Sequence, residues 1–151
     1  MSAIYSLTNP IFTNFAFYAA ASTIKMMAMS LLTSRQRLAK NIFANPEDIA
    51  LGSNKEAKVT LSDPDVERIR RNHLNDIENI LPFFVIGALY VATNPTPVVA
   101  LWHFRVFFFS RIFHTIAYQL ALPQPSRSLG FTAGYVATIS MAVQLFRALL
   151  K

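Results

Sequence analysis

Four long apolar stretches, separated by shorter polar segments, dominate the order of hydrophobic and polar residues along this chain. They cover about residues 11–33, 74–93, 97–122 and 128–150. Each is close to the ~20 residues that a helix needs to cross a bilayer. We therefore predict an all-α integral membrane protein, with four transmembrane helices in one membrane domain that covers residues 1–151.

Composition agrees with this class of protein. Hydrophobic residues make up 53% of the chain and charged residues 15%, which is too apolar for an ordinary soluble domain. A net charge of +6 in a membrane protein reflects basic cytosolic loops or anionic ligands, so we expect no nucleic-acid partner. Because the chain has no cysteine, disulfides, thiolate metal sites and a cysteine nucleophile are excluded, and any reactive thiol must belong to a ligand.

The distribution of basic residues predicts the orientation in the membrane. The turn 94–97 and residues 1–10 contain no Lys or Arg, whereas the loop 34–73 contains eight. These eight are Arg35, Arg37, Lys40, Lys55, Lys58, Arg68, Arg70 and Arg71. Because basic loops stay in the cytosol, we expect 34–73 and the short loop 123–127 to be cytosolic, with both termini on the other side.

The first stretch and the loop that follows it carry further local signals. The first stretch lacks the basic start of a signal peptide and contains Lys25, so a transmembrane helix is favoured over a cleaved leader. Within the loop, Asn45-Pro46-Glu47-Asp48 and Ser62-Asp63-Pro64-Asp65 are typical of turns or helix starts. The role of Lys25 stays open between snorkelling and pairing with a carboxylate.

A stripe of polar residues precedes the apolar part of the second stretch. Arg71, Asn75 and Glu78 are spaced i, i+4 and i+7, so they share one face of a helix. Ionisable residues at the mouth of a membrane span are costly and usually mark a functional site. A plain ion pair between helices is the structural alternative.

A second polar stripe lies in the cytosolic half of the third stretch. Arg111, His114 and Tyr118 are spaced i, i+3 and i+7 and again share a face. With the predicted topology, Arg127 of the last loop and Arg37 at the end of the first helix lie at the same membrane level. The excess of positive charge predicts an anionic ligand.

The residue types indicate which anion would suit. Arginine grips carboxylates with a planar pair of donors, so a small ligand with two carboxylates and one amine would match several Arg and one Glu. Glutathione has these groups and also brings the thiol that the chain lacks. An Arg beside the sulfur would lower the thiol pKa from roughly 8.5 and so favour the reactive thiolate. An apolar co-substrate would arrive from the bilayer.

Four segments, in the same order, resemble the membrane-associated eicosanoid and glutathione metabolism family (MAPEG). These segments are Phe43–Asp48, Asp63–Arg68, Arg71–Asp76 and Phe113–Tyr118. The resemblance runs from about Phe15 into the fourth stretch. Within the family it is greatest to the microsomal glutathione transferase branch, through Lys25-Met26-Met27, Asn75–Ile80 and Leu122–Pro125.

The resemblance implies a fold, an assembly and an activity. It implies a four-helix bundle per protomer, a homotrimer, and glutathione bound in clefts between protomers that open to the cytosol. The implied activities are conjugation of glutathione to lipophilic electrophiles and reduction of lipid hydroperoxides, both steps of detoxification. The implied location is the endoplasmic reticulum membrane, with the mitochondrial outer membrane as a second possibility. No metal is expected, since the histidines show no metal-ligand spacing.

The resemblance also assigns residues. Arg127 falls on the family's thiolate-stabilising arginine and is the candidate catalytic residue. The implied glutathione-binding residues are Arg37, Arg71, His73, Asn75, Glu78, Arg111, His114, Tyr118 and Arg127.

Other functions stay open at this point. In the prostaglandin E synthase branch, an Arg stands at the position of Leu74 and a Tyr at that of Phe131, which argues against that activity, whereas Ser128 argues for it. The family also contains non-catalytic lipid-binding scaffolds. A channel is disfavoured, because the polar groups gather at one membrane level. Ile49 replaces the reactive cysteine of the mammalian transferase branch, so activation by thiol modification is not expected.

Besides the role of Lys25, three further roles are left undecided by the sequence. Arg105 lies within the third stretch without an evident purpose. Asp76 is as well explained by pairing with a neighbouring helix as by ligand binding. Whether Ser128 takes part in the chemistry is equally open.

Overall fold

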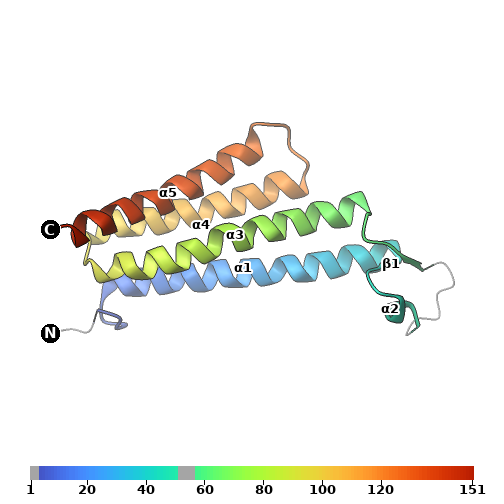
Figure 1. Cartoon of the computed structure of the whole chain (residues 1–151), viewed down its shortest axis with the longest axis horizontal. Coiled ribbons are helices and arrows are strands. Elements are labelled where there is room, and N and C mark those ends of the chain that lie inside the picture. Colours follow the sequence, from blue (N-terminus) through green and yellow to red (C-terminus); the bar gives the residue numbers. More distant parts are fainter. Residues whose placement is uncertain (1–3, 51–56) are drawn as a thin grey trace.

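The computed structural model describes residues 4–50 and 57–151, and its main feature is a set of four long helices that lie side by side (Figure 1). The long helices are α1 (Pro10–Lys40), α3 (Pro64–Ala92), α4 (Pro97–Gln119) and α5 (Ser126–Leu149). Successive helices run in opposite directions, so the α1–α3 and α4–α5 connections lie at one end of the bundle and both termini at the other (Figure 1). Each of the four apolar stretches therefore lies largely within a long helix, and the two loops share one end of the set.

The α1–α3 connection has some structure of its own. It contains the short helix α2 (Pro46–Ala50) and two strands of two residues each, β1 (Ile42–Phe43) and β2 (Lys58–Val59), which pair in parallel. α2 begins at the predicted helix start. Lys40 at the end of α1 forms ion pairs with Asp63 and Asp65 at the start of α3, which fastens the two helices together below the loop.

The helix ends follow from their capping residues. Asn9 accepts a hydrogen bond from the Ile11 backbone N–H at 3.0 Å, and Asp63 accepts from those of Asp65 and Val66 at 3.1 and 3.0 Å. In both helices a proline follows the cap, where its missing N–H costs nothing. Asn41 ends α1 with a left-handed backbone (φ 53°), a conformation that Asn tolerates well.

Two helices are longer than the apolar stretches that predicted them. α1 continues from residue 33 to Lys40, and α3 begins at Pro64 instead of near residue 74. The added segments are polar but contain no helix breaker, so the helices continue past the apolar limit. As a result the stripe of Arg71, Asn75 and Glu78 lies on one unbroken helix.

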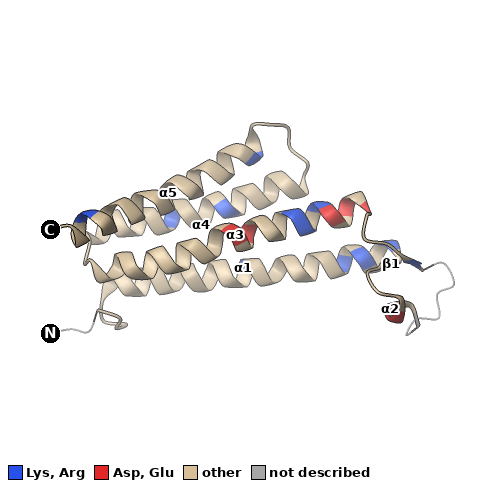
Figure 2. Cartoon of the chain, viewed as in Figure 1, with Lys and Arg blue, Asp and Glu red and all other residues tan. Residues whose placement is uncertain are grey.

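The surface of the bundle is that of a membrane protein. Large apolar side chains are widely exposed, including Leu31 (72%), Phe17 (65%) and Trp102 (59%), which suits a lipid environment. Among the described helices, α1, α3 and α5 are long and apolar enough to cross a bilayer. α4 is not among them, and it carries His103, Arg105, Arg111 and His114 along its length. Charged residues gather at the end with the two connections and become sparse toward the other end (Figure 2).

An aromatic core joins the helices along the middle of the bundle. The rings of Phe83 (α3) and Phe107 (α4) stack with centroids 3.9 Å apart, and Phe15 of α1 packs against Phe83 and Phe104. Gly87 allows α1 to approach closely, because a Cβ there would lie 2.4 Å from the Phe15 ring. This core holds α3 and α4 in the register that sets the polar residues beside one another.

Candidate functional site

A small polar pocket of about 220 Å³ lies between α3, α4 and the start of α5, at the end of the bundle with the two connections. Its lining comes from three helices and one connection. The lining residues are Asn75, His114, Tyr118, Gln124, Arg127, Ser128 and Phe131. Four of the predicted site residues, Asn75, His114, Tyr118 and Arg127, are thus brought together from distant parts of the chain.

Arg127 is held in the pocket by an aromatic face. Its guanidinium Cζ lies 5.0 Å from the centroid of the Tyr118 ring, an arrangement that attracts a cation to the ring. The Nε atom of Arg127 is buried and has no hydrogen-bond partner among the described residues. An unpaired buried donor is costly, so this atom is available to an acceptor from a ligand.

The start of α5 adds to the positive potential of the pocket. Arg127 and Ser128 belong to the first turn of α5, and its N-cap residue, Pro125, makes no side-chain cap hydrogen bond. The N–H groups of a first helical turn point away from the helix and favour negative charge nearby. The Ser128 hydroxyl donates to Gln124 Oε1 at 3.0 Å, which ties the loop to the helix.

Beneath the pocket, Arg111 is almost fully buried, with 1% of its surface exposed. Its Nη2 lies 2.7 Å from Asn75 Oδ1, 2.9 Å from Asp76 Oδ1 and 3.1 Å from His114 Nδ1, so the two hydrogens of this nitrogen are shared among three neighbours. Its Nε also donates to Asp76 Oδ1, at 3.2 Å. Arg111 therefore does not line the pocket but supports two residues that do.

Asp76 joins three helices through one carboxylate. It is fully buried, and it pairs with Arg111 of α4 and with Lys25 of α1. Lys25, whose role the sequence left open, thus pairs with a carboxylate, and Asp76 takes the helix-pairing role. Two cations face one anion here, so a net positive charge stays buried beside the pocket, where the low dielectric strengthens its effect.

The remaining predicted residues lie outside the polar pocket. Arg71 and His73 line a separate surface pocket of about 260 Å³ on α3, and Glu78 lines a groove of about 290 Å³ between α3 and α5. Arg71 and Glu78 are exposed and form no ion pair with the described residues, so the internal ion pair considered for them is not observed. Arg37 donates to the Thr60 carbonyl at 3.4 Å.

Two residues in or beside the pocket were not singled out from the sequence. Gln124 lines the pocket from the α4–α5 connection, and a single polar loop residue carries no sequence signal for this. Gly130 lets α5 approach α4, because a Cβ there would lie 3.0 Å from the His114 Cα. A glycine inside a helical stretch is a usable signal for close packing.

Arg105 also finds a place away from the pocket. Its Nε donates to the Tyr18 hydroxyl at 3.2 Å, and its guanidinium lies 5.8 Å from the Trp102 ring centroid. These contacts connect α1 and α4 on the outside of the bundle, so Arg105 has a structural role.

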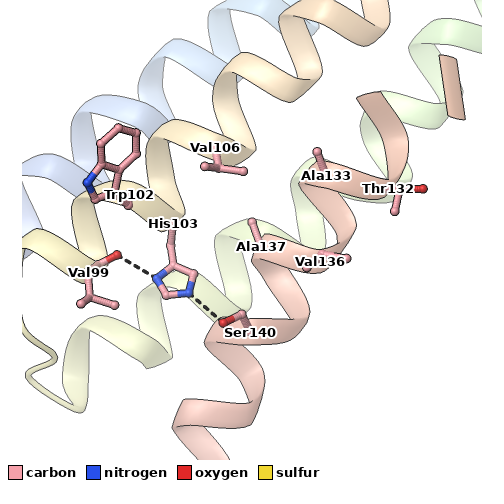
Figure 3. Close-up of a pocket in the computed structure, with 9 residues that line it drawn as sticks. All are labelled: Val99, Trp102, His103, Val106, Thr132, Ala133, Val136, Ala137 and Ser140. Carbon is pink, nitrogen blue, oxygen red and sulfur yellow. Dashed lines mark hydrogen bonds between the residues drawn. The ribbon is translucent and has the colours of Figure 1, made fainter. Parts of the chain in front are cut away.

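A larger groove of about 550 Å³ lies between α4 and α5, and Figure 3 shows its residues. Its walls are mostly apolar, and His103 is its main polar residue. His103 Nδ1 lies 2.9 Å from the Val99 carbonyl oxygen, which can only accept, so Nδ1 donates and Nε2 accepts from Ser140 Oγ at 2.9 Å (Figure 3). Both ring nitrogens are therefore occupied, and the groove offers no free polar group comparable to Arg127.

Comparison with known proteins identifies the family to which the chain belongs. The model of the MAPEG family matches residues 15–147. The chain is a member of the MAPEG family. This confirms the resemblance seen in the four sequence motifs and identifies the chain as a multi-pass membrane protein.

Individual MAPEG proteins are similar over nearly the whole chain. Microsomal glutathione S-transferase 1 of Homo sapiens is 49% identical over 144 residues, which cover 94% of this chain and 93% of that protein. Prostaglandin E synthase of Bos taurus is 42% identical over 131 residues, covering 87% and 84%. Prostaglandin E synthase of Homo sapiens is 39% identical over 139 residues, covering 92% and 90%. The higher identity to the transferase agrees with the branch that the motifs favoured.

Proposed function

We propose that this MAPEG protein is a membrane-bound glutathione transferase. It conjugates glutathione to lipophilic electrophiles and reduces lipid hydroperoxides at the expense of glutathione. The observation that carries the proposal is the polar pocket in which Arg127, held over Tyr118, keeps an unpaired buried donor beside Asn75 and His114. The 49% identity to microsomal glutathione S-transferase 1 supports the same assignment.

The chemistry begins with the thiol of glutathione. A free thiol has a pKa of roughly 8.5, so only a small fraction is ionised at neutral pH. The guanidinium of Arg127 favours the thiolate, and a shift of one pKa unit corresponds to about 1.4 kcal/mol. The net positive charge of Lys25, Arg111 and Asp76 acts in the same direction.

Two reactions follow from one thiolate. In conjugation, the sulfur bonds to the electrophilic carbon and the leaving group departs with the bonding electron pair. In peroxide reduction, the sulfur attacks the peroxide oxygen, an alcohol leaves after protonation, and a second glutathione releases the oxidised disulfide and water. In both cases Arg127 lies where it can also stabilise negative charge that develops on the substrate.

A homotrimer would complete the binding site. The pocket of about 220 Å³ is smaller than the roughly 300–1,000 Å³ of typical ligand sites, so one protomer provides only part of it. Arg71 and Glu78 are exposed on the same face of α3 as Asn75. A neighbouring protomer packed against this face would cover both residues and close the binding site around the ligand. In this arrangement the tripeptide contacts Asn75, Tyr118 and Arg127 of one protomer. Arg37, Arg71, His73 and Glu78 lie outside that pocket and would hold the rest of the tripeptide where the adjacent protomer closes the site.

We further propose that α4 is the fourth transmembrane helix. Two of its most polar residues, Arg111 and His114, are buried inside the bundle, so they are not presented to lipid. The basic connection between α1 and α3 then lies in the cytosol, and the pocket opens on that side. The endoplasmic reticulum membrane is the expected location, with the mitochondrial outer membrane as the second.

Isomerisation of a prostaglandin endoperoxide is the second candidate activity. It is favoured by one observation, the presence of Ser128 in the pocket beside Arg127. Phe131, which also lines the pocket, lacks the hydroxyl that the synthase branch has at this position. The transferase reading is therefore preferred.

The decisive experiment compares purified proteins in detergent for conjugation of glutathione to 1-chloro-2,4-dinitrobenzene. We expect Arg127→Ala to lower kcat by about 100-fold, as the loss of one charge-stabilising donor does elsewhere, while glutathione still binds. Arg105→Ala is the matched control, because it removes a guanidinium outside the pocket. An Arg127→Ala protein with full conjugation would exclude the proposed role of Arg127.

The same preparation separates the alternatives. Glutathione binding without conjugation in the wild type, together with a prostaglandin E product from the endoperoxide, would favour the isomerase. A wild type that does not bind glutathione at all would favour a lipid-binding scaffold.

A further inference from the structure

We infer that Arg111 is a positioning residue that turns the side chains of Asn75 and His114 so that both present N–H groups to the polar pocket. The pocket thereby becomes a subsite for a negatively charged acceptor, a carboxylate or a thiolate. The inference rests on the proposed function only for the ligand's identity, glutathione. It assigns Arg111 a different task from direct ligand contact.

The argument starts from the chemistry of arginine. A guanidinium has only donors, so every group that it contacts at hydrogen-bond distance must accept. Arg111 Nη2 lies 2.7 Å from Asn75 Oδ1. The amide oxygen of Asn75 is therefore directed to Arg111, and its NH2 group is left for the pocket. This NH2 group makes no hydrogen bond to the residues that the structure describes.

The same reasoning settles the tautomer of His114. Arg111 Nη2 lies 3.1 Å from His114 Nδ1, and because a guanidinium nitrogen cannot accept, a hydrogen bond here, with an Nη2 hydrogen shared with Asn75 or Asp76, requires Nδ1 to carry no proton. In a neutral imidazole the proton then resides on Nε2. Nε2 has no hydrogen-bond partner within residues 4–50 and 57–151, while His114 lines the pocket. His114 thus offers Nε2–H to whatever occupies the pocket.

Arg111 is held firmly enough to impose these orientations. Its Nε and Nη2 both donate to Asp76 Oδ1, at 3.2 and 2.9 Å, and Asp76 is held on its other side by Lys25. Arg111 is 1% exposed and Asp76 is fully buried, so water does not compete for the hydrogen bonds between them. Side chains fixed by buried partners need no reorganisation when a ligand arrives.

The resulting pocket is strongly biased toward donors. Asn75, His114 and Arg127 present nitrogen-bound hydrogens, and an adjacent network retains net positive charge. A neutral lipid or an apolar molecule would leave these donors unpaired, whereas an anion would satisfy them.

The first test reads the tautomer directly, without any ligand. In protein labelled with nitrogen-15 histidine, NMR shifts distinguish Nε2–H from Nδ1–H, and the His114 signals are identified by their loss in His114→Asn. We expect the Nε2–H form in wild type and a mixture in Arg111→Met, which keeps Asp76 paired with Lys25. Arg105→Met, on the same helix, should leave the tautomer unchanged. Wild-type His114 in the Nδ1–H form, as a mixture or doubly protonated would overturn the inference.

The second test replaces Asn75 by an isostere. Asn75→Asp keeps an oxygen for Arg111, so a purely structural role predicts an intact fold and unchanged binding. If the NH2 group faces the ligand, the new carboxylate repels it, and we expect the Kd for glutathione to rise by tenfold or more. Asn45→Asp, at an exposed loop position, controls for the added charge. An unchanged Kd in a folded Asn75→Asp protein would refute the donor role.

The two tests keep the inference separate from the proposed function. If wild type shows the Nε2–H tautomer but binds no glutathione, the transferase proposal fails and the positioning role of Arg111 stands. If wild type binds glutathione and His114 lacks the Nε2–H tautomer, the transferase proposal survives and the positioning role fails.

Discussion

The guanidinium of Arg127 lies over the ring of Tyr118, with Cζ 5.0 Å from the ring centroid, although the two residues belong to different helices. The ring face attracts the cation and so helps to hold the guanidinium at this place. Such contacts contribute about 0.5–2 kcal/mol, depending on how far water is excluded. The position of the candidate catalytic residue thus depends on an aromatic neighbour.

Two substitutions of Tyr118 should distinguish the contribution of its ring to catalysis from that of its hydroxyl. Tyr118→Leu removes the ring, and the loss of ~1 kcal/mol of positioning should lower kcat for conjugation about fivefold. Tyr118→Phe keeps the ring, so kcat should be retained while the KM for glutathione rises. Steady-state kinetics with varied glutathione measures both constants. Equal loss of kcat in both variants would show that the ring contact is unimportant.

Gly130→Ala should disturb the packing of α5 on α4. A Cβ at this position would lie 3.0 Å from the His114 Cα, which is backbone and cannot turn away. We expect a destabilisation of about 1–3 kcal/mol, as for other overpacked sites, and weaker glutathione binding because the pocket widens. Thermal unfolding in detergent and equilibrium dialysis would measure the two effects.

Whether Gly130→Ala lowers or raises the stability of the protein tests how closely α5 approaches α4. In an unhindered helix, glycine to alanine stabilises by up to about 1 kcal/mol. Thr132→Ala, at an exposed position of the same helix, is the matched control and should leave both readouts near wild type. A Gly130→Ala protein that is more stable than wild type would contradict the close approach.

Asp76→Asn should be far more harmful than Lys25→Met. Asp76 is the carboxylate that faces both Lys25 and Arg111, and its removal leaves two buried cations without a counterion, at a cost of about 3–5 kcal/mol. Lys25→Met leaves the Asp76–Arg111 pair intact and should cost clearly less. Unfolding midpoints in the same detergent compare the variants. Asp48→Asn, in the α1–α3 connection, should behave as wild type.

Acid should loosen the start of α3. The Val66 backbone N–H, with a further contribution from Lys40, holds the pKa of Asp63 below its ordinary value of 3.8. A lowered folded-state pKa means that the stabilisation is present above pH 3.8 and is lost as the pH falls through the folded value. Amide exchange protection of the first α3 turn should therefore fall on acidification. Asp63→Asn still caps the helix without a charge, so its protection should vary little with pH.

The pKa of Lys40, at the same junction between α1 and α3, is shifted in the opposite direction. Its hydrogen bond to Asp65, together with that to Asp63, raises the Lys40 pKa above 10.5. Its contribution is complete below pH 10.5 and is lost as the pH rises through the higher folded value. The α1–α3 junction should therefore be tightest across the neutral range. A junction that loosens between pH 6 and pH 8 would indicate that other groups control it.

Much of the fold was accessible from the order of apolar and polar residues. The four stretches and the helix starts at Asn45–Asp48 and Ser62–Asp65 all correspond to observed elements. The predicted spans 11–33 and 74–93 are shorter than the helices α1 and α3 that contain them, because apolarity marks the membrane limit and not the helix limit. Helix propensity continues through Lys40 and begins again at Pro64, where no breaker intervenes.

The candidate site was accessible only in part. The two stripes on α3 and α4 followed from helical periodicity, and the loop topology placed them with Arg127 at one end. Periodicity could not distinguish the roles of Arg111 and His114, which lie on the same face of α4. Whether a side chain enters a pocket or supports one depends on its contacts with another helix, and these contacts cannot be predicted from the periodicity of one helix.

The sequence by itself determined the class of protein, the four long apolar segments and the chemistry available, since these depend on composition and local periodicity. Tertiary structure alone decided the pairing of Lys25 with Asp76, the orientation of Asn75 and His114 by Arg111, and the seat of Arg127 on Tyr118. These contacts join residues far apart in the chain, and they form because the helices pack against one another through an aromatic core, which includes the stacked rings of Phe83 and Phe107.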